Sequence, residues 1–142
     1  MCLKFEKFII SQKAIIIRDE KCLILEFSSK PGFWDVPGGR IHKGEDADLA
    51  FKREVREEVG LNNIQYPKIY SRKNFNYFSK KMEKMISVCA LFFIIQDKKR
   101  KEIILSEEHL QYKWISEDEI KDYKFYWAFM SEVIRDGFKK LK

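Results

Sequence analysis

The most informative segment of this sequence is GGRIHKGEDADLAFKREVREEVGL, residues 38–61. Five of the chain's six glycines lie between residues 32 and 60. Glycine allows backbone conformations and close approaches that other residues do not, so this concentration predicts an unusual loop. Residues 46–59 then have the spacing of an amphipathic helix, which Gly60 is expected to end. Any chemistry is therefore expected where the loop meets the helix.

Three glutamates fall on one side of the predicted helix. Glu54, Glu57 and Glu58 are related by i, i+3 and i, i+4 spacing, so their side chains meet. A solvated acidic face is the commonest explanation of such a pattern. However, like charges at this spacing repel one another, and acids near a helix C-terminus oppose its dipole. A divalent cation would relieve both effects, and carboxylate oxygens suit Mg²⁺ or Mn²⁺.

The loop before the helix is compatible with a phosphate ligand. Arg40 and Lys43 lie among its glycines, and magnesium sites often combine protein carboxylates with substrate phosphates. The loop is not a P-loop, because the pattern GxxxxGK[ST] does not occur. No GxSxG pattern occurs either, so nothing in the sequence favours a covalent nucleophile.

Taken together, residues 39–61 resemble the Nudix box, GX5EX7REUXEEXGU, in which U is an aliphatic residue. All nine defined positions match over 23 residues. They are Gly39, Glu45, Arg53, Glu54, Val55, Glu57, Glu58, Gly60 and Leu61. Trp34 and the pair Pro37-Gly38 are similar to the common lead-in to that box. The sequence is therefore identified as resembling a Nudix hydrolase.

The resemblance implies a fold and an activity. The expected fold is α/β, an α/β/α sandwich with a mixed sheet and the box as a catalytic loop–helix unit. Residues 1–142 are expected to form a single Nudix hydrolase domain. Nudix hydrolases use Mg²⁺ or Mn²⁺ to cleave the pyrophosphate linkage of a nucleoside diphosphate joined to another moiety.

The expected substrate is a nucleoside triphosphate or a dinucleoside polyphosphate. Tyr77 lies 16 residues beyond Leu61, a spacing similar to that of dinucleoside polyphosphate hydrolases. Many ADP-ribose hydrolases carry a proline near this position, where this chain has Asn76.

The resemblance also implies roles for residues of the box. The expected metal ligands are the Gly38 carbonyl and the carboxylates of Glu54, Glu57 and Glu58. The structural positions are Gly39, Glu45, Gly60 and Leu61. Arg53 is expected to hold a box glutamate through a salt bridge, and an indirect metal contact is the alternative for Glu45.

The general base is left open at this point. In the family it is either a box glutamate or a glutamate on a later loop, where this chain has Glu107, Glu108 and His109. We favour Glu108, although a merely polar turn before a strand would give the same pattern. The expected catalytic residues are Glu54, Glu57, Glu58, Arg53 and Glu108.

Contacts to the substrate are expected from the loop and from aromatic rings, because rings stack on any base. The expected substrate-binding residues are Trp34, Gly39, Arg40 and Tyr77. Phe33, Tyr70, Phe75 and Phe78 are further candidates, although most of the 21 aromatic residues must belong to the core.

The remaining patterns predict elements that would enclose this unit. Residues 14–27 resemble a hairpin, residues 64–78 an extended stretch, and residues 85–95 a strand buried on both faces. Further elements expected are short strands at 102–105 and 111–115, a capping box at Ser116 and Glu119, and an amphipathic helix at 126–141.

Composition restricts the class of protein. The chain has 142 residues, 45% of them hydrophobic, with a net charge of +6. Its longest uncharged apolar run, residues 85–95, is too short to cross a bilayer. The N-terminus does not resemble a signal peptide, and three widely spaced cysteines favour a reducing compartment. We therefore expect a cytoplasmic enzyme with a small nucleotide substrate, no membrane, DNA or RNA partner, and a possible homodimer.

A different class of function also has to be considered. The same fold can serve as a non-catalytic module that binds nucleotides or RNA. Such modules usually lose carboxylates of the box, and this chain retains all of them. Cleavage of capped RNA ends is a third possibility, which the basic composition permits.

Overall fold

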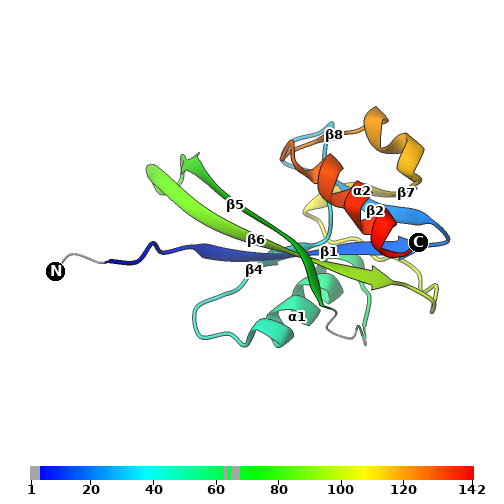
Figure 1. Ribbon diagram of the computed structural model, residues 1–142, viewed down its shortest axis with the longest axis horizontal. Coiled ribbons are helices and arrows are strands. Elements are labelled where there is room, and N and C mark those ends of the chain that lie inside the picture. Colours follow the sequence, from blue (N-terminus) through cyan, green and yellow to red (C-terminus); the bar gives the residue numbers. More distant parts are fainter. Residues whose placement is uncertain (1–3, 63, 65–67) are drawn as a thin grey trace.

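Figure 1 shows the computed structural model of the chain, which describes residues 4–62, 64 and 68–142. A curled mixed sheet has the strand order β5-β6-β1-β2-β3-β8, with β4 paired to β1 and β7 paired to β2. The strands are β1 (Ile9–Arg18), β2 (Lys21–Phe27), β3 (Phe33–Asp35), β4 (Gly38–Arg40), β5 (Ile69–Ser79), β6 (Lys84–Gln96), β7 (His109–Ile115) and β8 (Lys124–Phe125). The helices are α1 (Ala47–Val59), the 3₁₀ helix η1 (Glu117–Asp122) and α2 (Met130–Lys140).

The predicted N-terminal hairpin is confirmed as β1 and β2. Asp19 and Glu20 form its turn with φ angles of 50° and 62°, which suits the twist of a two-residue hairpin. Strand β1 also pairs in parallel with β6 and antiparallel with β4. It is therefore the central strand, and the loop that precedes α1 is attached directly to it.

Both faces of β1 are buried, and this gives the molecule two cores. On one face, Ala14 and Ile16 pack beneath α1. On the other face, Ile15 and Ile17 pack beneath α2. Figure 1 shows the two helices on opposite sides of the sheet. The expected α/β/α sandwich with a mixed sheet is confirmed.

Helix α1 begins and ends where the sequence predicts. The Asp46 carboxylate accepts a hydrogen bond from the Leu49 amide at 3.0 Å and caps its first turn. Gly60 ends the helix with a left-handed φ of 75°, and its amide donates to the Arg56 carbonyl at 2.9 Å. Leu61 is buried in the same core as α1.

The prediction of a strand at residues 102–105 is wrong. These residues make no sheet pairing and instead run past the C-terminal end of α1. The Ile104 amide donates to the Val59 carbonyl at 2.9 Å, and the Ser106 amide donates to the Glu58 carbonyl at 3.1 Å. Carbonyls at a helix C-terminus need partners outside the helix, and this segment supplies them.

The C-terminal helix is shorter than predicted. It begins at Met130 instead of residue 126, because the Tyr126 amide donates to the Trp34 carbonyl at 3.0 Å. The capping box at Ser116 and Glu119 is present, but it starts the 3₁₀ helix η1. Among the residues that the structure describes, no helix is long and apolar enough to cross a membrane.

Two strands also differ in detail from the prediction. Strand β5 begins at Ile69, and residues 65–67 of the expected extended stretch lie outside the described residues. Strand β6 is enclosed on both faces only around Phe92 and Phe93. Met85 near its start is 61% exposed, because that end of the β5–β6 hairpin extends beyond both helices (Figure 1).

We expect Gly60→Ala to destabilise the fold more than Gly44→Ala. Both glycines have left-handed φ angles, 75° and 79°, and alanine in that region costs about 1–2 kcal/mol. A Cβ at residue 60 would also lie 2.9 Å from the Cβ of Ile104, whereas a Cβ at residue 44 meets nothing within 4 Å. Urea unfolding should therefore show an additional loss of about 1–3 kcal/mol for Gly60→Ala. Equal losses in the two variants would contradict the packing described at Ile104.

Candidate active site

Arg53 connects the acidic residues of the loop and helix α1. Its Nε and Nη2 donate to the two carboxylate oxygens of Glu45 at 2.6 and 3.0 Å. Its Nη1 donates to Glu54 at 2.9 Å and to Glu57 at 3.2 Å. The Arg53 hydrogen bonds lower the pKa of Glu45 to about 2. One guanidinium thus offsets the repulsion between three carboxylates and ties the loop to the helix.

The glycine pair lies directly against two of the box glutamates. A Cβ at residue 39 would lie 2.5–2.6 Å from the carboxylate oxygens of Glu54. The Gly38 amide donates to Oε2 of Glu58 at 2.9 Å. Strand β4 and helix α1 are therefore in contact through these four residues, and a Cβ at residue 39 would displace the Glu54 carboxylate.

A buried ion pair within the sheet interacts electrostatically with Glu58. The Lys13 ammonium contacts the Asp35 carboxylate at 2.7 Å, and both side chains are largely buried. Burial alone would lower the pKa of Lys13, but the charges of Asp35 and Glu58 outweigh it and raise this pKa. Burial raises the pKa of Glu58 to about 8, against the opposing effect of Lys13.

Lys13 and Asp35 were not among the site residues predicted from the sequence. Their signal was present, because Lys13 interrupts the apolar strand β1 and Asp35 lies between Trp34 and Val36, which are both buried. A buried charge needs a partner, but the sequence does not reveal which residue provides it.

The carboxylate oxygens at the contact between β4 and α1 suit a hard divalent cation. Glu54, Glu57 and Glu58 offer carboxylate oxygens, and the raised pKa of Glu58 marks a carboxylate without sufficient compensating charge. In the part of the chain that the structure describes, no three His, Cys, Asp or Glu side chains are gathered around one point. Arg53 contacts Glu54 and Glu57, whereas Glu58 is bonded to Gly38. The metal role of these residues stays a prediction.

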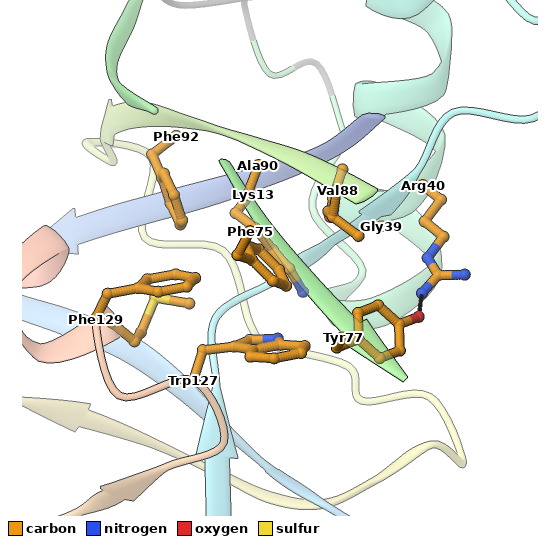
Figure 2. A pocket seen from close by; sticks show the side chains of 12 residues that line it. Lys13, Gly39, Arg40, Phe75, Tyr77, Val88, Ala90, Phe92, Trp127 and Phe129 are labelled. Carbon is orange, nitrogen blue, oxygen red and sulfur yellow. Dashed lines mark hydrogen bonds between the residues drawn. The ribbon is translucent and has the colours of Figure 1, made fainter. Parts of the chain in front are cut away.

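Figure 2 shows a cavity of about 180 Å³ beside the glycine pair, which we call the aromatic cavity. Two predicted substrate-binding residues meet at its edge, where the Arg40 guanidinium donates a hydrogen bond to the Tyr77 hydroxyl. Gly39, the third, also lines it. The other lining residues are Ser11, Lys13, Phe75, Val88, Ala90, Phe92, Trp127, Phe129 and Met130.

Trp34 is not among the residues that line the aromatic cavity. It is 7% exposed, and its ring packs edge-on against Tyr123 with 5.2 Å between the ring centroids. Trp127 and Phe129 line the cavity instead, and sequence reasoning missed them because it assigned both to a helix. Phe75 lies 4.5 Å from Trp127 and 5.3 Å from Phe129, measured between ring centroids.

A second cavity, of about 380 Å³, also has Lys13 in its wall, and we call it the loop cavity. It brings Glu108 to the same space as Glu58. The other lining residues are Lys13, Phe27, Ser28, Ser29, Asp35 and His109. The Glu107 carbonyl accepts a hydrogen bond from the Ser28 hydroxyl at 2.9 Å, which fixes the loop there. Glu108 and Glu58 thus line the same space, and the role of Glu108 as the base stays a prediction.

Comparison with known sequences identifies the family. The family model of the NUDIX domain matches residues 10–136. The chain belongs to the Nudix family. A relative from Buchnera aphidicola subsp. Schizaphis graminum, 8-oxo-dGTP diphosphatase, is 32% identical over 126 residues, which cover 87% of this chain and 86% of the relative. The asymmetrical bis(5'-nucleosyl)-tetraphosphatase of Mus musculus is 30% identical over 99 residues, which cover 68% of this chain and 65% of that enzyme.

Solved Nudix structures have the same fold. The MutT protein from Methanosarcina mazei Go1 gives a TM-score of 0.77 at 27% identity, over 99% of both chains. An Ap4A hydrolase from C. elegans gives a TM-score of 0.68 at 24% identity, over 94% of this chain and 96% of that one. The predicted family and fold are confirmed, and the named relatives confirm the prediction of a Nudix pyrophosphohydrolase.

We expect Glu58→Gln to stabilise this Nudix protein in EDTA, increasingly so at higher pH. The folded-state pKa of Glu58 is about 8, and that of an unfolded glutamate is about 4.3. The native protein therefore holds a proton that the unfolded chain has lost, and stability falls as pH rises through this interval. A glutamine at position 58 still accepts the hydrogen bond from Gly38 and never ionises.

Urea unfolding should show similar stabilities at about pH 5 and a variant more stable by about 1–3 kcal/mol at about pH 9. Glu57→Gln is the matched control, because that side chain is 55% exposed. The difference in free energy of unfolding between Glu57→Gln and the unmodified protein should not grow with pH in this way. A Glu58→Gln variant that loses stability at both pH values would show that burial of this carboxylate is not the controlling effect.

Proposed function

We propose that this protein is a divalent-metal-dependent pyrophosphohydrolase that acts on a nucleoside triphosphate or a dinucleoside polyphosphate. The observation that carries the proposal is the complete set of box carboxylates beside a glycine pair and two cavities, with Arg53 bonded to Glu54 and Glu57 and Gly38 bonded to Glu58. Hydrolysis at a nucleotide pyrophosphate linkage is the activity common to the named relatives.

Mg²⁺ or Mn²⁺ would be held by Glu54, Glu57 and Glu58 together with the Gly38 carbonyl. When bound, such an ion neutralises phosphate oxygens and makes a water molecule more acidic. The protein's own residues define where this happens. The Arg53 hydrogen bonds fix the directions of Glu54 and Glu57, and the Gly38 amide fixes that of Glu58. Ligands that are already oriented need little rearrangement during the reaction.

Glu108 is the base that we favour for removing a proton from the attacking water. It lines the loop cavity together with Glu58, so a water between them would have a carboxylate on each side. His109 lies next to it, but its ring is only 8% exposed and burial lowers its pKa. The exposed carboxylate of Glu108 is more accessible to a water molecule in the cavity.

The nucleoside is proposed to enter the aromatic cavity. Arg40 stands at its edge, where a phosphate attached to the nucleoside would pass toward the box (Figure 2). Phe75, Tyr77 and Trp127 supply rings on which a base can stack. Such stacking accepts every base, so these contacts support a nucleotide as substrate without choosing among the bases.

The remaining expectations about partners and location belong to the same proposal. A small nucleotide requires no nucleic-acid or membrane partner, and we propose a cytoplasmic enzyme. A homodimer stays possible. The alternative, a module that binds nucleotides or RNA without cleaving them, gives no role to the full set of box carboxylates that this chain carries.

We expect Glu57→Gln to lose at least about 100-fold in kcat with saturating Mg²⁺, because removing a ligand charge weakens stabilisation of the transition state by several kcal/mol. The assay measures products from a panel of nucleoside triphosphates and dinucleoside polyphosphates with Mg²⁺, with Mn²⁺ and with EDTA. Asp48→Asn is the matched control, since it removes a carboxylate from the first turn of the same helix.

The control variant should retain most of the activity, and all activity should disappear in EDTA. Near-normal turnover by Glu57→Gln would refute its role as a ligand. If the unmodified protein bound these nucleotides with Mg²⁺ but cleaved none of them, the non-catalytic alternative would replace the proposed function.

A further inference from the structure

The β5–β6 hairpin extends beyond both helices, and its outer end lies apart from the candidate active site (Figure 1). Phe75 and Tyr77 of β5 and Val88 of β6 line the aromatic cavity. Residues 78–85 continue beyond them and form the end of the hairpin, with a turn at residues 80–83. None of these eight residues lines the aromatic cavity or the loop cavity. Any role of this end is therefore separate from the proposed chemistry.

The N-terminal segment, residues 4–8, lies beside this end of the hairpin. The Ser87 hydroxyl of β6 donates a hydrogen bond to the Glu6 carboxylate at 2.8 Å. Ile9, which follows the segment directly, is paired with Val88 in the parallel ladder between β1 and β6. We call residues 4–8 and 78–85 together the tip surface.

The tip surface exposes large apolar side chains to solvent. Phe78 and Met85 are cross-strand partners, and they are 58% and 61% exposed. Met82 in the turn is 47% exposed, and Phe5 and Phe8 of the N-terminal segment are 84% and 40% exposed. Single exposed apolar residues are ordinary, but a group of them on one projecting end indicates an interaction surface.

The same thirteen residues are strongly basic. They include five lysines and two glutamates, which give a net charge of +3, half of the +6 of the whole chain. The lysines are Lys4, Lys7, Lys80, Lys81 and Lys84, and all of them are exposed. Within the described part of the chain, none of the five forms an ion pair. Their charge is therefore available to an anionic partner.

The combination of methionines with lysines favours an anionic lipid surface over other anionic partners. Met82 and Met85 have no ring on which a nucleic-acid base could stack and no strong hydrogen-bonding group. Apolar side chains of this kind can enter the boundary between headgroups and acyl chains, while lysines stay at the level of the anionic headgroups. A second copy of the chain would place one basic tip surface against another, and like charges disfavour that arrangement.

We propose that the tip surface docks this protein on a bilayer that contains anionic lipids. Phe78, Met82 and Met85 enter the interface, and the lysines contact the headgroups. The expectation of no membrane partner rested on the lack of a spanning segment and on a small substrate, and docking at an interface needs neither a spanning segment nor a lipid substrate. The aromatic cavity lies next along the same two strands, so the docked protein holds this cavity close to the membrane surface.

The test measures how the full chain co-sediments with vesicles. One set of vesicles contains phosphatidylcholine alone, and the other contains phosphatidylcholine mixed with phosphatidylglycerol, each at low and at high salt. Two double variants remove the two contributions separately. Met82→Ser/Met85→Ser removes exposed apolar side chains of the tip surface, and Lys80→Gln/Lys81→Gln removes two of its charges.

Each double variant has a matched control elsewhere on the surface. Ile69→Ser/Leu110→Ser changes two apolar side chains that are exposed to a similar extent as the methionines. Lys98→Gln/Lys99→Gln changes an exposed pair of lysines beyond the opposite end of β6. Thermal unfolding of all four variants shows whether they are folded, and exposed turn residues such as Lys80 and Met82 are expected to tolerate these changes.

The unmodified protein should bind the mixed vesicles at least about ten-fold more strongly than phosphatidylcholine alone, and high salt should remove most of this difference. Lys80→Gln/Lys81→Gln should lower the partition coefficient for the mixed vesicles about ten- to thirty-fold, because each lysine near an anionic surface contributes to binding. Met82→Ser/Met85→Ser should lower it at least about ten-fold through lost apolar burial. The control variants should change it less than about two-fold.

Equal binding to the two kinds of vesicle, or equal losses in the tip and control variants, would overturn this inference. Binding to single-stranded RNA but not to vesicles, lost in the tip variants, would assign the surface to a nucleic acid instead. A dimer that the tip variants convert to monomers, without vesicle binding, would assign it to a second copy of the chain. If one tip variant fails to fold, the other variant and the salt dependence still decide the question. None of these outcomes depends on hydrolysis, so the proposed function is tested separately.

Discussion

The contact between strand β4 and helix α1 is the constraint on which the rest of the site depends. The Glu54 carboxylate lies where a side chain of residue 39 would be, and the Gly38 amide holds Glu58 at 2.9 Å. A Cβ at residue 38 would lie 2.1 Å from the Gln12 carbonyl oxygen, so glycine is required at that position. Because β4 pairs directly with β1 at the centre of the sheet, the helix and the loop are fixed relative to both cores.

The charges at this contact destabilise the folded protein, because one of its carboxylates is buried. Arg53 compensates Glu45, Glu54 and Glu57, whereas Glu58 is buried and its pKa is raised. Burying a carboxylate without full compensation opposes folding. Such unfavourable positions tend to be kept where function needs them. The same corner therefore combines a structural cost with the chemistry that we propose for it.

Errors of the sequence-based predictions concern segments whose conformation is set by distant neighbours. Residues 102–105 have an apolar pattern compatible with a strand, but their backbone amides serve the last carbonyls of α1. Residues 126–129 have helical spacing, but the Tyr126 amide is bonded to Trp34. Trp34 is 7% exposed and lies in the core, and its contact with a substrate stays a prediction. No local pattern reports such long-range partners.

The sequence by itself determined the family, the limits of α1, the left-handed stop at Gly60 and the set of carboxylates on one side of the helix. These features depend on spacing along a regular helix and on the restricted conformations of single residues, which are local properties. Only the tertiary structure decided that Lys13 and Asp35 join the candidate site, that Trp127 lines the aromatic cavity, and that Lys13 lines both cavities. These features depend on which strands the sheet brings together, and β1 meets β6 across more than seventy residues of intervening chain.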